Sequence, residues 1–184
     1  MSGLSDDRPA DTQPPVSPPR FASGSLETNK LAPFNPTDAS AQEAALSFLT
    51  ISGEDVLYDL GCGDARFLVA AHLSMPSGSA MASVGVEYDK VYYDRAVAAC
   101  SPFPHICIQH ADVVTVDMSD ATAVFVYLVP DGLKLITDKL YAVLRRGGRI
   151  ASYMFSVPGL TPVQTILTKG GCKVQGYDKS SLPE

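Results

Sequence analysis

Acidic side chains flank a pair of glycines in the first half of the chain. The group consists of Asp59, Leu60, Gly61, Gly63 and Asp64. Glycines permit a sharp backbone turn and let a ligand approach the main chain closely. The apolar run before the turn is typical of a buried strand, and residues 65–75 after it are typical of a helix. A strand, a glycine turn and a helix start form the first half of a nucleotide-binding βαβ unit.

The charge of this turn indicates which kind of ligand it would accept. A dinucleotide site needs a third glycine at position 66, where this chain has Arg66. Asp59 and Asp64 would also repel a pyrophosphate, whereas they suit a ligand with positive charge and no phosphate. S-adenosylmethionine (SAM) has these properties, because it combines a sulfonium, an α-ammonium, a ribose diol and an adenine. We therefore expect SAM as the cofactor.

Two further acids follow later strands of the expected sheet. Glu87 ends the predicted strand 83–87, where a carboxylate can accept hydrogen bonds from both ribose hydroxyls. Asp112 comes shortly after the next predicted strand, residues 106–108. The alternative interpretation is structural, since an acid at such a place can also cap a helix or form a turn.

Two of these segments resemble the class I, Rossmann-like SAM-dependent methyltransferases, whose sheet has seven strands. Residues 59–64 are similar to the first motif of the family, D-L-G-x-G-x, and residues 85–89 (Gly-Val-Glu-Tyr-Asp) are similar to its second signature. Residues 123–159 resemble a narrower group, the small protein-lysine methyltransferases related to those acting on mitochondrial ATP synthase and the adenine nucleotide carrier. The resemblance implies the following cofactor contacts: Asp59, Leu60, Gly61 and Gly63 at the methionine end, Glu87 at the ribose and Asp112 at the adenine amine.

The carboxyl end of the predicted fourth strand, residues 121–129, is the expected place for the methyl acceptor, because open α/β sheets bind ligands there. Methyltransferases that act on adenine, cytosine or glutamine carry N-P-P-Y or D-P-P-Y at this point, whereas this chain has Tyr-Leu-Val-Pro. The resemblance implies transfer to another nitrogen, with a protein lysine as the expected acceptor. The acceptor-channel candidates are Phe34, Tyr127, Pro130 and Phe155, with Asn35 as a further lid residue. No general base is named.

The order of elements predicts an α/β fold with a Rossmann-like, doubly wound sheet. A helix over residues 38–49 precedes the first strand and begins either at an Asp38 cap or at a capping box from Ser40 to Glu43. Residues 173–177 are predicted as a sixth strand. Residues 178–184 are too short for a seventh, which leaves open whether the sheet lacks its last strand.

The composition of the chain indicates its domain organisation, its class of partners and its location. Residues 31–184 are long enough for one methyltransferase domain, and residues 1–30, rich in proline and serine, are expected to be a disordered tail. A net charge of −6 gives no reason to expect nucleic acid as a partner. No apolar run is long enough for a membrane span, and neither cysteines nor histidines have the spacing of metal ligands. Without a targeting signal we expect a cytoplasmic location, with mitochondria and nucleus left open.

Three other functions remain compatible with the sequence. The acceptor could be a small molecule, which would change only the mouth of the pocket. The chain could also be a non-catalytic SAM-binding partner subunit, since Ala65 stands where the resembled group has glycine and the C-terminal region is short. A dinucleotide oxidoreductase is opposed by Arg66 and by the acidic turn. Neither the number of methyl groups transferred nor the oligomeric state follows from these residues.

Overall fold

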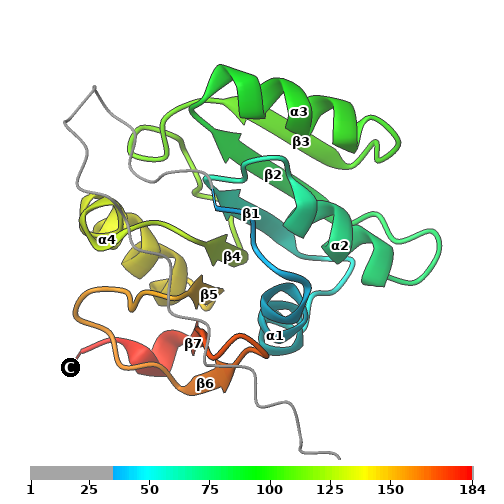
Figure 1. Ribbon diagram of the computed structural model, residues 1–184. Helices are drawn as coiled ribbons and strands as arrows, with labels where there is room; N and C mark the ends of the chain where they lie inside the picture. The colour runs from blue at the N-terminus through cyan, green and yellow to red at the C-terminus, as the bar shows by residue number, and fades with distance from the viewer. Residues whose placement is uncertain (1–34, 184) are drawn as a thin grey trace, which may run out of the picture.

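One mixed sheet of seven strands lies at the centre of the computed structural model, which describes residues 35–183 (Figure 1). The strand order is β3-β2-β1-β4-β5-β7-β6, and β7 runs antiparallel to the other six strands. The strands are β1 (Val56–Leu60), β2 (Ala82–Glu87), β3 (Ile106–His110), β4 (Ala123–Val126), β5 (Arg149–Tyr153), β6 (Gln164–Leu167) and β7 (Lys173–Tyr177). The helices are α1 (Ala39–Leu49), α2 (Arg66–Ser74), α3 (Lys90–Cys100) and α4 (Pro130–Arg145), and a 3-10 turn, Lys179–Ser181, follows β7. The predicted α/β, Rossmann-like fold is confirmed.

Helices cover both faces of the sheet, so that its central strands are buried on both sides (Figure 1). Alternate residues of a strand point to opposite faces. In β4, Val124 and Val126 therefore join the core under α4, whereas Phe125 joins the core under α1, α2 and α3. Phe125 stacks on Phe67 of α2 with ring centroids 4.0 Å apart. The buried stripe of α4 consists of Leu133, Ile136, Leu140, Val143 and Leu144.

The strand order reverses between β1 and β4. The chain runs from β1 outward through β2 and β3 and then returns to β4 on the other side of β1. Because connections leave the sheet in opposite directions at such a point, a crevice opens beyond the carboxyl ends of the two strands. The glycine turn follows β1 and Tyr127 follows β4, so both sequence-derived halves of the site meet at this crevice.

The sheet is complete, and the suspected loss of its last strand is wrong. Residues 164–167 form β6, which pairs antiparallel with β7 and makes the strand 173–177 the seventh in sequence. Three of the four β6 residues are exposed, Leu167 at 66%. An edge strand needs little apolar sequence to be stable once a neighbour pairs with it, which explains why its pattern gave no signal.

The start of α1 agrees with one of the two predicted capping schemes. Asp38 caps the helix, because its Oδ1 accepts a hydrogen bond from the Ala41 N–H at 2.9 Å. The Ser40 hydroxyl donates to the same oxygen, so the predicted box between Ser40 and Glu43 is not formed. Aspartate accepts hydrogen bonds well at this position, and one side chain here satisfies a backbone donor and a hydroxyl together.

A buried ion pair ties the amino ends of three strands to α1. Asp55 Oδ2 accepts from Arg149 at 3.0 Å and from the Ser52 N–H at 2.8 Å, while its Oδ1 accepts from the Thr122 hydroxyl. Arg149 Nε also donates to the carbonyl of Leu49 at the end of α1. Burial alone would raise the pKa of Asp55, but the hydrogen bonds and the Arg149 charge outweigh it and hold the pKa below its usual range. This network stabilises the end of the sheet opposite the crevice.

Part of the predicted organisation falls on residues that the structure does not describe. The proposed tail, residues 1–30, and the candidate Phe34 lie outside the described residues. Across residues 35–183, no helix has the length and apolar character that crossing a bilayer requires.

Candidate active site

The glycine turn after β1 is held by the end of β2. The N–H groups of Gly61 and Cys62 donate to the carbonyl of Val86 at 2.9 and 3.0 Å. Gly61 has a φ of +79°, and a Cβ at this position would lie 3.2 Å from the Leu128 side chain after β4. A side chain is therefore excluded here both by backbone conformation and by space. The turn lies close against the segment that begins with Tyr127.

Asp59 is a buried carboxylate for which residues 35–183 provide no bonding partner. Its residue is 3% exposed, and within residues 35–183 its side chain neither accepts a hydrogen bond nor pairs with a lysine or arginine. Burial and then the charges of Glu87 and Asp64 raise the pKa of Asp59 well above its ordinary value. A buried anion left in this state favours a cationic ligand that would compensate it. The α-ammonium of SAM fits this requirement.

Arg66 offsets part of the negative charge that Asp64 adds to the turn. Arg66 donates to it through both Nε and NH2, at 2.9 and 2.6 Å, in the two-pronged geometry that arginine forms with carboxylates. This pairing lowers the pKa of Asp64 and partly balances its charge. The two acids of the turn therefore differ: Asp64 has a cationic partner in Arg66, whereas Asp59 has none among residues 35–183.

Ala65 adopts a conformation that glycine accepts more readily. Its φ of +60° and ψ of 19° place it in the left-handed region just before α2. For a residue with a Cβ this region costs roughly 1–2 kcal/mol. The alanine thus keeps the turn in the shape that a glycine would give it, at a cost in stability.

Glu87 links the glycine turn to the start of α3. Its Oε2 accepts from the Gly63 N–H and its Oε1 accepts from the Asp89 N–H, both at 2.8 Å. A carboxylate has about four lone-pair directions, so each oxygen can accept one further hydrogen bond. The two backbone bonds fix the carboxylate in position at the end of β2, where a ribose diol could donate to it.

Asp112 follows β3 in a tight turn. Its Oδ1 accepts from the Val114 N–H at 2.8 Å, which is the turn geometry that the structural alternative anticipated. Oδ2 accepts no hydrogen bond from residues 35–183 and can still receive one from a ligand. The strand register places Glu87 opposite His110, two residues before Asp112, so the two acids lie along the same edge of the sheet.

Tyr127 lies at the centre of a polar and aromatic group on the acceptor side. Its hydroxyl accepts from Asn35 Nδ2 and donates to Met154 Sδ, both at 2.9 Å. Its ring meets that of Tyr153, the last residue of β5, edge to face with centroids 4.7 Å apart. The Tyr153 hydroxyl donates to Asp38 Oδ2 at 3.0 Å.

The structure separates the other acceptor-channel candidates from this group. Phe155 packs against the core under α4, on the face of the sheet opposite to Tyr127, and Pro130 is an exposed residue at the start of α4. The sequence did not single out Tyr153 as a site residue, and it considered Asp38 only as a cap. The rule that ligands bind beyond strand ends points to Tyr153, because it is the last residue of β5.

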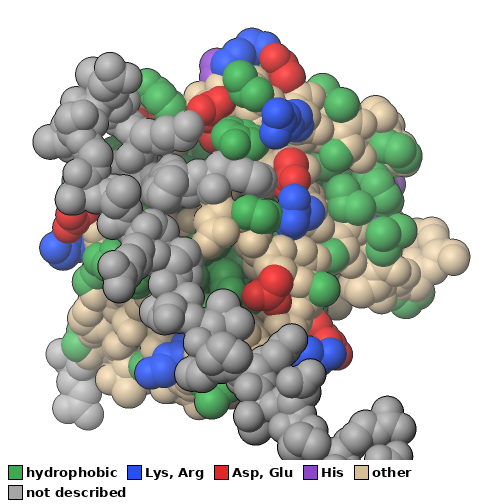
Figure 2. All heavy atoms as spheres, viewed as in Figure 1, with side chains coloured by type: hydrophobic (Ala, Val, Ile, Leu, Met, Phe, Trp, Pro, Cys, Tyr) green, Lys and Arg blue, Asp and Glu red, His purple; other side chains and the backbone are tan. Residues whose placement is uncertain are grey.

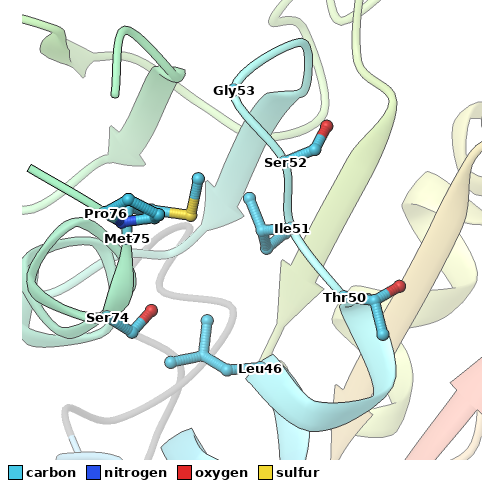
Figure 3. Close-up of a pocket in the computed structure, with 8 residues that line it drawn as sticks. All are labelled: Leu46, Thr50, Ile51, Ser52, Gly53, Ser74, Met75 and Pro76. Atoms are coloured by element: carbon cyan, nitrogen blue, oxygen red, sulfur yellow. The ribbon is translucent and has the colours of Figure 1, made fainter. Parts of the chain in front are cut away.

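A hollow at the other end of the sheet carries none of these groups. It has a volume of about 410 Å³ and lies between the ends of α1 and α2 and the loop before β1. Figure 3 shows Leu46, Ile51 and Met75 around it, and none of its eight lining residues is charged. Its position at the amino end of β1 keeps it apart from the crevice.

Comparison with known proteins identifies the family. Residues 59–164, more than half of the chain, match the ANTKMT methyltransferase domain family. The chain belongs to this family. It is a SAM-dependent methyltransferase domain, and its cofactor is SAM.

Relatives of this ANTKMT methyltransferase domain include two curated enzymes and a solved structure. A protein-lysine N-methyltransferase of Saccharolobus islandicus is 28% identical over 142 residues, covering 76% of this chain and 86% of that protein. The adenine nucleotide translocase lysine N-methyltransferase of Mus musculus is 33% identical over 125 residues, and the match covers 66% of this chain but only about half, 52%, of the mouse protein. An RNA methyltransferase of Salinibacter ruber, solved with S-adenosylhomocysteine, superposes with a TM-score of 0.71 at 25% identity, over 82% of this chain and 95% of that one.

Proposed function

We propose that this ANTKMT methyltransferase domain transfers the methyl group of SAM to the side-chain nitrogen of a protein lysine. The two curated relatives carry names that specify lysine methylation, and one of them matches over most of its own length. The end of β4 supports the same acceptor, because Tyr127 and Leu128 stand where an adenine- or glutamine-directed enzyme would need an acid or amide.

The unpartnered Asp59 carboxylate is the observation that carries the cofactor site. We assign Asp59 to the α-ammonium of SAM, Glu87 to the ribose hydroxyls and Asp112 to the adenine amine, with Leu60, Gly61 and Gly63 along the methionine end. SAM supplies a methyl group activated on a positively charged sulfur. Asp59 and Glu87 hold their places before any ligand arrives, one through burial and the other through two backbone hydrogen bonds.

Alignment is the main contribution of this chain to the reaction. The lone pair of an unprotonated amine must approach the methyl carbon opposite to the sulfur, and holding both groups in line converts a bimolecular step into an effectively unimolecular one. The crevice between β1 and β4 provides this geometry, because the cofactor turn and Tyr127 lie on its two sides. The amine proton passes to water.

RNA is the second candidate acceptor, because the Salinibacter ruber structure is named as an RNA methyltransferase. The charge of this chain argues against it. The net charge is −6, and on the face drawn in Figure 2 the visible lysine and arginine side chains are scattered and do not gather into a basic patch. Sequence-independent binding to RNA relies on such a patch.

Two measurements test the proposal. Calorimetric titration with S-adenosylhomocysteine, with NAD as control, tests the cofactor site. Transfer of labelled methyl groups from SAM is then measured on three panels: protein lysates with arginine-blocked and lysine-blocked controls, total RNA, and small metabolites. Label released as methyllysine after protein hydrolysis supports the proposal. Label that appears in RNA or in metabolites alone rejects lysine as the acceptor, and cofactor binding without transfer favours the non-catalytic subunit.

A further inference from the structure

The acceptor side of the crevice contains a carboxylate, Asp38, that forms no ion pair with a residue of the described part of the chain. Asp38 stands before α1, is exposed to solvent, and is held by three donors: Ser40 and Ala41 on Oδ1 and Tyr153 on Oδ2. Within residues 35–183, no lysine or arginine forms an ion pair with it. The Asp38 carboxylate is therefore an oriented anion that remains free to attract a positive charge.

The two tyrosines next to Asp38 form an aromatic wall on the same face of the sheet. β4 and β5 run parallel with Val126 opposite Ser152, so the next residues, Tyr127 and Tyr153, lie side by side. Their rings meet at 4.7 Å, and both belong to the core side covered by α1. Aromatic faces attract cations through their negative π surface, and this attraction adds to that of a carboxylate.

This group also lies next to the cofactor turn. Val126 pairs with Leu60 across β4 and β1, and Leu128 approaches Gly61 closely. Tyr127 stands between these two contacts and faces α1, where Asn35 donates to its hydroxyl. Tyr153 is 5% exposed and belongs to the core, whereas Tyr127 is only partly buried, so Tyr127 is the ring of the pair that lies nearer the surface between Asp38 and the cofactor turn.

We propose that Asp38, oriented by Tyr153 and backed by Tyr127, is the recognition site for the ammonium group of the acceptor lysine. This inference rests on the proposed function and adds the residue that selects a cationic acceptor. Asp38 acts in binding, before the chemical step: it attracts the charged side chain to the mouth of the crevice, and the amine loses its proton to water before it reacts.

Capping alone does not account for the carboxylate. Asparagine caps a helix about as well as aspartate does, since a side-chain oxygen that accepts from the backbone is all that the cap requires. The pKa of Asp38 is nevertheless lowered, because the hydrogen bonds from Ser40, Ala41 and Tyr153 outweigh the raising effect of burial. The charge therefore persists at neutral pH, and Asp38→Asn removes it while it keeps the cap.

The test uses the full chain loaded with S-adenosylhomocysteine and two small probes. N-acetyl-lysine methylamide carries the ammonium, and N-acetyl-norleucine methylamide has the same side-chain carbons without it. Probe binding is measured by NMR titration of the wild type, of Asp38→Asn and of Asp94→Asn, which makes the same charge change on the exposed face of α3. We expect the lysine probe to bind Asp38→Asn about fivefold more weakly than the wild type, as for one solvent-exposed ion pair, and to bind Asp94→Asn like the wild type.

Further readouts separate recognition from a structural role. The difference between wild type and Asp38→Asn should shrink as salt rises, because exposed charges are screened, and the thermal midpoints of the two proteins should agree. Tyr153→Phe should weaken lysine-probe binding by a smaller factor, because the carboxylate remains but loses its orienting bond. Equal binding of the lysine probe to wild type and Asp38→Asn, equal binding of both probes to the wild type, or no lysine-probe binding at all would overturn the proposal. The titration needs no turnover, so it can fail while lysine methylation is found, and the reverse.

Discussion

Replacing Asp59 with asparagine should change stability and cofactor affinity in opposite directions. Asparagine keeps the shape of the side chain and removes its charge. Asp59 is 3% exposed, has no partner within residues 35–183, and lies near the charges of Glu87 and Asp64. The variant loses this repulsion, but it also loses the charge that we assign to the α-ammonium of SAM.

The sign of the stability effect follows from the raised pKa. Because the pKa of Asp59 is higher in the folded state than in the unfolded state, the folded protein is favoured at low pH and loses that advantage as pH rises through the folded pKa. The substituted asparagine does not titrate, so the wild type and Asp59→Asn diverge as pH rises toward neutrality. An unpartnered buried charge costs on the order of 1–2 kcal/mol more than an unpartnered amide, which raises Tm by roughly 2–8 °C at pH 7.5 in a domain of this size.

The affinity effect is estimated from the hydrogen bond that would be lost. Bonds to charged groups contribute about 1.5–3 kcal/mol, so S-adenosylhomocysteine should bind Asp59→Asn roughly 10- to 150-fold more weakly. The wild type should also bind more tightly as pH rises, since the carboxylate must lose its proton to receive a cation, and this pH dependence should be absent in the variant. Calorimetric titration between pH 5.5 and 8 measures both effects, and scanning calorimetry of the free proteins measures Tm.

A matched control lies five residues away. Asp64 is already paired with Arg66, so Asp64→Asn should change affinity less than threefold and should not raise Tm. If Asp59→Asn binds S-adenosylhomocysteine as tightly as the wild type, or if its Tm falls below that of the wild type, the assignment of Asp59 as an unsatisfied cation site is refuted.

Three further changes test other parts of the structure. Ala65→Gly should stabilise the chain by about 1 kcal/mol in urea unfolding, because glycine accepts the left-handed conformation; an unchanged midpoint would show that the turn is not strained. Asp55→Asn should destabilise the chain by about 2–4 kcal/mol, because it leaves Arg149 without its acidic partner. Since the pKa of Asp55 is lowered, the stability difference between wild type and variant should persist at neutral pH and vanish as pH falls through that pKa. A stability difference that does not change with pH would refute the role of the Asp55 charge. Glu87→Gln should weaken S-adenosylhomocysteine binding about tenfold in calorimetry, because an amide NH2 faces a backbone donor; unchanged binding would remove the ribose assignment.

Local patterns predicted the elements that are buried on both faces. The residues of β4 form an unbroken apolar run, those of β1 are apolar apart from Asp59, and the spacing of apolar residues in α4 indicates a helix, so these signals survive without any knowledge of neighbours. Exposed elements gave weaker signals. On α3 the apolar residues Val91 and Val97 are 58% and 43% exposed, so apolar type alone does not mark its buried face.

Contacts between distant segments explain what the sequence did not show at the site. The sequence shows two acidic residues in the glycine turn. It does not show that Asp64 pairs with Arg66, because this pairing depends on side-chain geometry. Asp38 and Tyr153 lie far apart in sequence and meet only because α1 packs over the end of β5. No local sequence pattern indicates such a pair, so it can be identified only in the folded structure.

The packing of α1 has a consequence for biosynthesis. A Cβ at Gly176 in β7 would collide with the ring of Phe48 in α1. Arg149 in β5 donates to the carbonyl of Leu49, which ends α1. The first helix of the described residues therefore packs against β5 and β7, which are translated after it. On the ribosome, β1, α2 and β2 can associate early, as N-terminal segments do, while the apolar side of α1 waits for its partners. The acceptor half of the crevice is thus completed after the cofactor half, since β5 and β7 follow the glycine turn along the chain.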